Sequence, residues 1–256
     1  MTLVWRPGFQ FDADASTYIE AVEVADGQAL ETGVRYAINN FVIGCKQDGI
    51  WSAIKASCIL AGARTLAGCL VPLVGTAPTN FNFVAGDYNR KTGLVGDGST
   101  KYLDSKAAHS LSPKNNGHCS VFASSVGSIT PPKYYLGVSE ADCVTNLATS
   151  SNDNGWIIHD PGSIVPFFSD AGTGFKAIAR SNSSSYIRRS QANSVTVART
   201  SGTGTPGAQT YTIFGRNQLF LASCRLSFYS IGESLDLALL DGRVTDLMNA
   251  LGAAIP

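Results

Sequence analysis

Short extended segments separated by turn residues recur from about residue 80 onward, and this pattern constrains the fold more than any other feature. The clearest of these segments are 118–126, 133–138, 174–180, 194–200 and 219–232. They are rich in β-branched and aromatic residues, and Gly, Asn, Ser and Pro stand between them. Repeated strands at such short intervals predict an antiparallel sandwich, because an α/β fold would place helices between its strands.

An Asp-Gly pair, Asp97-Gly98, follows the apolar residues Leu94 and Val95. The short extended segment Lys101–Leu103 comes after it. Asp-Gly between two extended runs is the strongest short-range signal of a β-hairpin, since Gly adopts the positive φ that a tight turn requires. We therefore predict that the two flanking segments pair as a hairpin. The long strand over 219–232, ahead of a terminal helix, is predicted to lie beside them and close the sandwich.

A helical period replaces the strand pattern between residues 12 and 55. One helix is predicted from Asp12 to the Asp26-Gly27 break, and a second over 28–46. The second helix has a continuous apolar stripe: Leu30, Val34, Ala37, Ile38, Phe41, Val42 and Cys45. Two short amphipathic helices cannot bury their stripes alone, so they pack on the sandwich or on another chain. Val34, Phe41 and Trp51 are therefore candidate oligomer-interface residues, with a place in the core as the alternative.

These patterns divide the chain into two predicted parts, 1–79 and 80–256. The first contains an extended arm over Val4–Phe11, the helical unit, and an Ala- and Gly-rich connector over 56–79. The arm either adds to a neighbour's sheet or is a frayed terminus. The second part is the sandwich with a final helix, whose apolar face is Leu237, Leu240, Val244, Leu247 and Leu251.

Charge and cysteine content exclude several classes of function. The 19 Lys and Arg residues balance 19 Asp and Glu residues without a basic stripe, so nucleic-acid binding has little electrostatic support. Sparse charge suits a protein that packs against other subunits. The six cysteines form no C-x-x-C pair, so we expect reduced, buried thiols rather than disulfides or a zinc site. We expect no secretion signal and no membrane span, and synthesis in a reducing cytoplasm.

The chain contains none of the common catalytic motifs: no G-x-S-x-G, no phosphate-binding loop and no H-E-x-x-H. A glycosidase requires two carboxylates that face each other, and Glu140 with Asp142 is a poor candidate pair because both lie in a predicted loop. His109, His118 and His159 do not cluster in the sequence. We therefore expect no catalytic residues, no cofactor and no metal site.

Sugar binding by a sandwich uses exposed aromatic rings beside polar loops. The candidates here are Tyr134, Tyr135, Trp156 and Tyr186, with Arg188 as a basic partner for an acidic sugar. For each aromatic residue, a position in the core or in an interface is the alternative.

Two stretches together resemble a known family: Asp87–Leu103, and Phe228-Tyr229-Ser230-Ile231-Gly232-Glu233-Ser234-Leu235. They are similar to the laminin-G or concanavalin A-like lectin domain of structural proteins from tailed bacteriophages, over roughly residues 80 to 256. The resemblance implies a jelly-roll sandwich in a virion protein, either a fibre, a tail component or a capsid decoration. It also implies a homo-oligomer, with a trimer favoured, other virion proteins as partners, and contact with host surface glycans. The alternatives are a carbohydrate-active depolymerase on the same fold and a glycan-binding module with no virion role.

Overall fold

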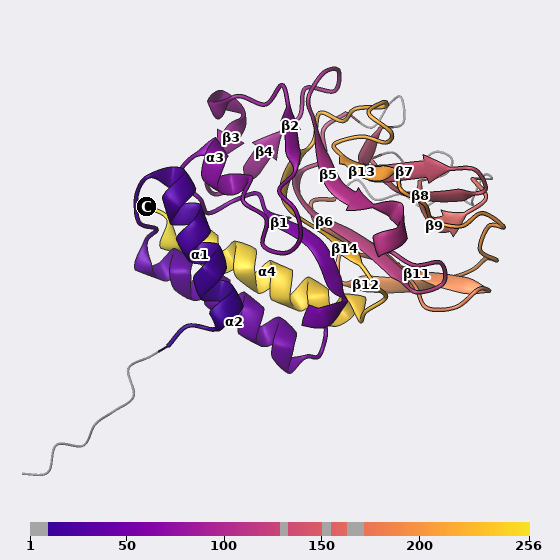
Figure 1. The fold of residues 1–256 in the computed structure, drawn as a ribbon, viewed down its shortest axis with the longest axis horizontal. Helices are drawn as coiled ribbons and strands as arrows, with labels where there is room; N and C mark the ends of the chain where they lie inside the picture. The colour runs from indigo at the N-terminus through magenta and orange to yellow at the C-terminus, as the bar shows by residue number, and fades with distance from the viewer. Residues whose placement is uncertain (1–9, 129–132, 150–154, 163–171) are drawn as a thin grey trace, which may run out of the picture.

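The computed structural model describes residues 10–128, 133–149, 155–162 and 172–256 (Figure 1). Two antiparallel sheets stack on each other, and a layer of helices covers one of them. This arrangement confirms the predicted mainly β sandwich with an N-terminal helical unit and a C-terminal helix. Residues 4–9 of the expected arm lie outside the described residues.

Sheet A runs in the order β12-β11-β10-β6-β14-β4-β3, and β1 also pairs with β14. Its strands are β1 (Ile54–Ile59), β3 (Tyr88–Asn89), β4 (Gly93–Val95), β6 (Gly117–Ser125), β10 (Gly174–Arg180), β11 (Ser185–Ser190), β12 (Asn193–Ala198) and β14 (Arg225–Gly232). Sheet B runs in the order β2-β5-β13-β7-β8-β9. Its strands are β2 (Thr79–Phe81), β5 (Tyr102–Ala108), β7 (Tyr134–Glu140), β8 (Cys143–Ala148), β9 (Trp156–Asp160) and β13 (Thr210–Ile213).

The predicted Asp97-Gly98 hairpin is wrong, because its two flanking strands belong to different sheets. β4 pairs with β14 in sheet A, whereas β5 pairs with β2 and β13 in sheet B. The Asp97 carboxylate accepts hydrogen bonds from the backbone N–H groups of Ser99, Thr100 and Lys101 at 2.8–3.0 Å. The side chain therefore closes the turn by itself, and the turn carries the chain from one sheet to the other.

The predicted contact between the first and the closing strand is confirmed. Leu94 of β4 lies opposite Leu226 of β14, and Val95 lies opposite Arg225. The closing strand is shorter than expected, since β14 begins at Arg225 and residues 219–224 form part of a loop.

Helices α1 (Ala13–Asp26), α2 (Thr32–Gln47) and α4 (Leu237–Ala254) form the layer on sheet A (Figure 1). The Phe41 ring of α2 meets the Phe228 ring of β14 edge-on, with 5.8 Å between ring centroids. Val34 and Phe41 are buried within the chain, so neither is available to a second copy as an interface residue. The half-buried Trp51 donates through Nε1 to Asp14 at 3.1 Å. α4 supplies the apolar partner of α2, and it comes from the other end of the chain.

The connector predicted over 56–79 is partly a strand of the main sheet. β1 pairs with β14 from Ile54↔Gly232 to Ile59↔Phe228, so residues 54–59 belong to sheet A. The expected boundary between residues 79 and 80 falls inside β2, and buried residues on both sides of it belong to one hydrophobic core. Residues 69–74 of the expected connector contain the end of α3 (Leu66–Cys69) and one isolated bridge, Ser57↔Val74.

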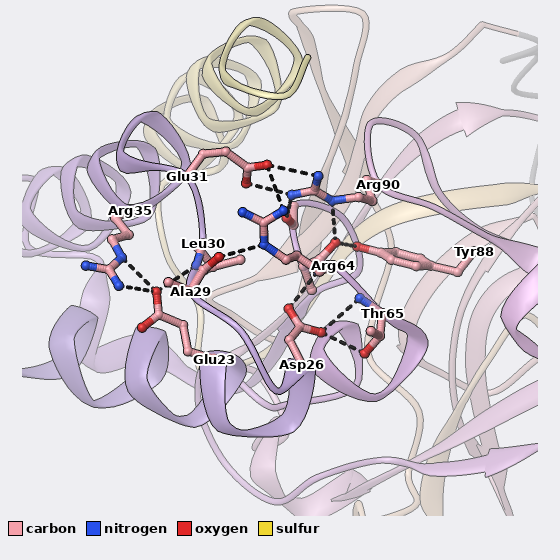
Figure 2. Close-up of polar contacts among 12 residues, drawn as sticks. Glu23, Asp26, Ala29, Leu30, Glu31, Arg35, Arg64, Thr65, Tyr88 and Arg90 are labelled. Atoms are coloured by element: carbon pink, nitrogen blue, oxygen red, sulfur yellow. Dashed lines mark hydrogen bonds and ion pairs between the residues drawn. The ribbon is translucent and has the colours of Figure 1, made fainter.

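A set of charged and polar contacts joins the α1–α2 hairpin to the sandwich (Figure 2). At the end of α1, the Asp26 carboxylate accepts from the backbone N–H groups of Arg64 (2.6 Å) and Thr65 (2.8 Å), and from the Thr65 hydroxyl (2.7 Å). Glu31, at the start of α2, binds Arg90 through both carboxylate oxygens at 3.0 and 2.7 Å. Hydrogen bonding to the Arg90 guanidinium lowers the pKa of Glu31. These contacts fix the helical layer to the loop that follows β1 and to the segment after β3.

Asp26→Ala is expected to lower the free energy of unfolding by about 2–3 kcal/mol, because two backbone N–H groups and one hydroxyl lose their acceptor together. Chemical denaturation monitored by circular dichroism measures the change. Glu20→Ala, at an exposed position of the same helix, is the matched control and is expected to change stability by less than about 0.5 kcal/mol. Equal effects of the two substitutions would contradict the structural role of Asp26.

Candidate functional site

The five residues that the sequence marks as candidate sugar contacts are all in the interior. Tyr134, Tyr135, Trp156, Tyr186 and Arg188 are each exposed by 6% or less. Their polar atoms hold strands together: Trp156 Nε1 donates to the Ala148 carbonyl at 3.0 Å, and the Tyr186 hydroxyl donates to the Trp156 carbonyl at 2.8 Å. This burial corrects the expectation of exposed stacking rings at these positions, and it supports the core alternative.

A tight turn between β13 and β14 has unusual backbone geometry. Arg216 and Leu219 exchange two backbone hydrogen bonds of 2.9 Å, and the two residues between them, Asn217 and Gln218, have φ values of 48° and 63°. Two positive φ values at the centre of a two-residue turn are the type I′ pattern, which favours Asn-Gly because glycine carries no Cβ. Here the second residue is glutamine, which costs about 1–2 kcal/mol in the left-handed conformation.

The strain extends along the loop and is held by neighbouring groups. Phe214 and Phe220 also have positive φ values, 67° and 54°. The Asn217 side chain binds the backbone of Ser139 in both directions, through two hydrogen bonds of 2.9 Å. The Gln218 N–H donates to the Thr212 hydroxyl at 3.0 Å. Non-glycine residues in such conformations persist where surrounding contacts over-determine them, and they cluster at functional sites.

This turn presents an aromatic ring and a cation to the solvent. Phe220 is 49% exposed, and its neighbour Leu219 is 61% exposed. The Arg216 guanidinium lies 4.5 Å from the centroid of the Tyr134 ring and 5.2 Å from that of Phe220. The guanidinium is therefore fixed against two aromatic faces while it remains partly accessible.

A second aromatic pair continues the same surface. The Tyr102 hydroxyl lies 3.4 Å from Gln218 Oε1, and the Tyr102 ring stacks on Phe81 with centroids 4.4 Å apart and planes within 8°. We name the surface formed by Phe81, Tyr102, Arg216, Gln218 and Phe220 the aromatic ledge. It combines apolar ring faces with an amide and a guanidinium, and it is the candidate functional site.

The three histidines are buried, and two of them meet although they are far apart in the sequence. The ring centroids of His109 and His159 are 5.3 Å apart. His109 Nδ1 lies 2.7 Å from Glu140 Oε2, and His159 Nε2 lies 3.3 Å from the Ser112 hydroxyl. Burial lowers the pKa of His109, and it lowers the pKa of His159 to about 3. Both imidazoles are therefore neutral at pH 7 and fully enclosed, which suits a structural role.

The carboxylates weighed as a catalytic pair have other partners. Glu140 binds His109 and accepts from the Gly207 N–H at 2.7 Å, and Asp142 accepts from the Thr203 hydroxyl at 3.1 Å. Within the described part of the chain, no three His, Cys, Asp or Glu side chains gather as metal ligands, and no helix has the length and apolar character to span a membrane.

The cysteines are reduced and buried, as predicted from their spacing. Burial raises the pKa of Cys58 and of Cys45 to about 12. All six thiols are therefore shielded from solvent and largely protonated at neutral pH.

No protein-family model matches the chain, and no curated protein matches it. One similar solved structure is a mutant of Trypanosoma rangeli sialidase displaying trans-sialidase activity, with 8% identity and a TM-score of 0.47 over 83% of this chain and 39% of that chain. Another is the binding domain of botulinum neurotoxin DC in complex with rat synaptotagmin II, with 15% identity and a TM-score of 0.40 over 62% of this chain and 42% of that chain.

A third is domain 4 of an extracellular arabinanase from Geobacillus stearothermophilus in complex with arabinotriose, with 13% identity and a TM-score of 0.38 over 68% of this chain and 82% of that chain. The chain thus spans about two-fifths of the length of the sialidase and neurotoxin structures. At these low scores, the fold assignment rests on the strand pairing described above.

Proposed function

We propose that this chain is a non-catalytic glycan-binding protein of a tailed-bacteriophage particle, and that the aromatic ledge is its sugar-binding surface. The observation that carries the sugar-binding part is the exposed Phe220 ring, with the Arg216 guanidinium 5.2 Å from its centroid and the exposed Gln218 two residues before it in the chain. A pyranose ring offers C–H groups that stack on an aromatic face, and hydroxyls that require hydrogen-bond partners nearby. The ledge supplies both kinds of group at adjacent positions.

The rigidity of the turn supports the same proposal. Gln218 and Phe220 have positive φ values, which these residue types disfavour, and hydrogen bonds of Asn217 and Thr212 stabilise this backbone. The ledge is therefore formed before a ligand binds. A preorganised surface loses less conformational entropy on binding, and weak sugar contacts benefit most from that saving.

The particle part of the proposal rests on the resemblance of Asp87–Leu103 and Phe228–Leu235 to phage structural proteins. In that setting the chain is made in the host cytoplasm and assembled into the virion as a fibre, tail or capsid-decoration component. Mass spectrometry of purified particles tests this part, because the chain must be present at a fixed copy number. Its consistent absence from particles would refute the virion role and leave sugar binding to be judged separately.

Phe220→Ala is expected to weaken glycan binding by roughly 10- to 100-fold, equivalent to about 1.4–2.7 kcal/mol, because the exposed stacking face is lost. A glycan array identifies the ligand for the wild-type chain, and calorimetry measures its affinity. Leu239→Ala removes a comparably exposed apolar side chain (40% exposed) from α4 and is expected to leave the affinity unchanged. Unaltered binding by Phe220→Ala would show that the ledge is not the site.

A further inference from the structure

β12 is an unprotected edge of sheet A. Its six residues pair only with β11 among the described residues, and all except Val197 are exposed. The other sheet ends are blunted: β3 has two residues, β2 has three, and β9 is buried throughout. Sheet edges are normally protected by charged residues or proline, but Asn193–Ala198 contains neither.

The free backbone groups of β12 can be assigned from the hydrogen-bond pattern. The Arg199 N–H donates to the Ser184 carbonyl at 2.8 Å, in register with the Ala198↔Ser185 pair. Hydrogen-bonded and non-hydrogen-bonded pairs alternate along an antiparallel ladder, so the odd-numbered residues of β12 bond to β11. Ser194, Thr196 and Ala198 therefore direct their N–H and C=O groups away from the sheet.

Apolar side chains lie on both faces of this edge. Val195 is 48% exposed, and Val197 lies two residues further along the same face. On the opposite face, Ile187 of β11 is 40% exposed and lies directly across from Thr196. A strand added at this edge would cover apolar surface on both faces as well as complete the backbone hydrogen bonds.

We propose that β12 pairs antiparallel with β12 of a second copy about a two-fold axis, which joins two sheets A into one continuous sheet. A register centred on Thr196 uses all three outward-facing residues, since Ser194 then lies opposite Ala198 of the partner subunit. Val195 of each copy then packs beside Val197 of the partner subunit. An uncharged strand brings no like charges together at the axis, and a two-fold contact of this kind closes at two copies. The resulting dimer differs from the trimer that the family resemblance implies.

Light scattering coupled to size-exclusion chromatography tests the proposal on the full chain. The wild-type chain is expected to be a dimer at micromolar concentration. Thr196→Pro removes the outward N–H without affecting the ladder to β11, and is expected to give a folded monomer. Thr196→Val retains the N–H and is expected to remain a dimer. A wild-type monomer or trimer, or a dimer that persists in Thr196→Pro, would overturn the proposal.

A cross-linking experiment decides the case even if Thr196→Pro fails to fold. The six native thiols are buried, so Thr196→Cys adds the only exposed one. Hydrogen-bonded antiparallel pairs have Cα atoms about 5.5 Å apart, within the range of a disulfide. Diamide, a thiol oxidant that is reduced as it takes up two electrons and two protons, is expected to give a covalent dimer.

Val24→Cys, at an 83% exposed position on α1, is the control and is expected to stay uncross-linked. Equal cross-linking of both variants would contradict pairing at β12. So would a dimer that depends on residues 1–9 and shows no cross-link at position 196, because that result would assign the contact to the arm.

Discussion

Gly93→Ala is expected to destabilise the fold by about 4 kcal/mol or more, as judged from the midpoint of urea unfolding. Gly93 has a φ of +91°, and a Cβ at this position would lie 2.0 Å from the carbonyl oxygen of Leu226. The obstacle is the backbone of β14, which cannot rotate away as a flexible side chain can. Losses of this size arise only from a few mechanisms, and a steric clash at a strained backbone position is one of them.

Gly242→Ala is the matched control. Gly242 is an exposed position inside α4, and a Cβ there would meet nothing within 4 Å. Alanine is a better helix former than glycine, so this variant is expected to be more stable by up to about 1 kcal/mol. If Gly93→Ala were as stable as the wild type, β4 could not lie against β14 as described, and the two ends of the sandwich would not meet.

The second large effect is a loss of stability in mild acid. Burial lowers the pKa of His118 to about 4 and that of His159 to about 3, below the value of about 6.5 in the unfolded chain. The unfolded state therefore binds protons first as the pH falls. The stability that these neutral imidazoles contribute is complete above pH 6.5, and each is expected to lose about 1.4 kcal/mol per pH unit below it.

Urea unfolding at several values between pH 7 and pH 5 measures this slope. Asp and Glu side chains titrate mainly below this window in the unfolded chain, so histidines dominate the slope within it. His118 Nδ1 donates to the Glu233 carbonyl, and Nε2 lies 2.9 Å from the Ser230 hydroxyl. His118→Gln is expected to reduce this slope by about 1.4 kcal/mol per pH unit, because the unfolded state then binds one proton fewer. Stability that stays constant from pH 7 to pH 5 would contradict the burial of neutral histidines.

Much of the fold could be predicted from local periodicity. The strand over 174–180 coincides with β10, and the strand over 118–126 coincides with β6 to within one residue. The five residues predicted as the apolar face of the last helix are all buried. These predictions succeed because burial of one face leaves a repeat of two or 3.6 residues in the sequence.

Contacts between distant segments could not be predicted in the same way. Asp97-Gly98 has the composition of a hairpin turn. Which strand pairs with β4 depends on residues far away in the sequence, and in the structure β4 pairs with β14 instead of β5. Val34 and Phe41 have the pattern of an interface stripe, and nothing local indicates that α4 covers them. The contact between His109 and His159 also depends on topology. The two residues are 50 positions apart, so no local repeat in the sequence indicates that they meet.

The aromatic ledge could not be predicted from the sequence, because its turn has positive φ values at residues other than glycine. Leu219 and Phe220 continue the apolar run toward β14, so they were predicted as part of that strand. The turn places Gln218, after a favoured Asn217, where glycine is expected. Asn217, two residues after Gly215, is a local signal of a turn, and it is weak without a following glycine. Functional sites are where local rules are most often broken.

Chemical-shift mapping by NMR shows directly whether the aromatic ledge binds a glycan. The assigned chain is titrated with the oligosaccharide that ranks highest on the array. We expect the largest amide and aromatic shifts on Phe81, Tyr102 and residues 216–220, and we expect them to disappear in Phe220→Ala. Shifts confined to another face of the sandwich, or none at saturating ligand, would contradict glycan binding at the ledge.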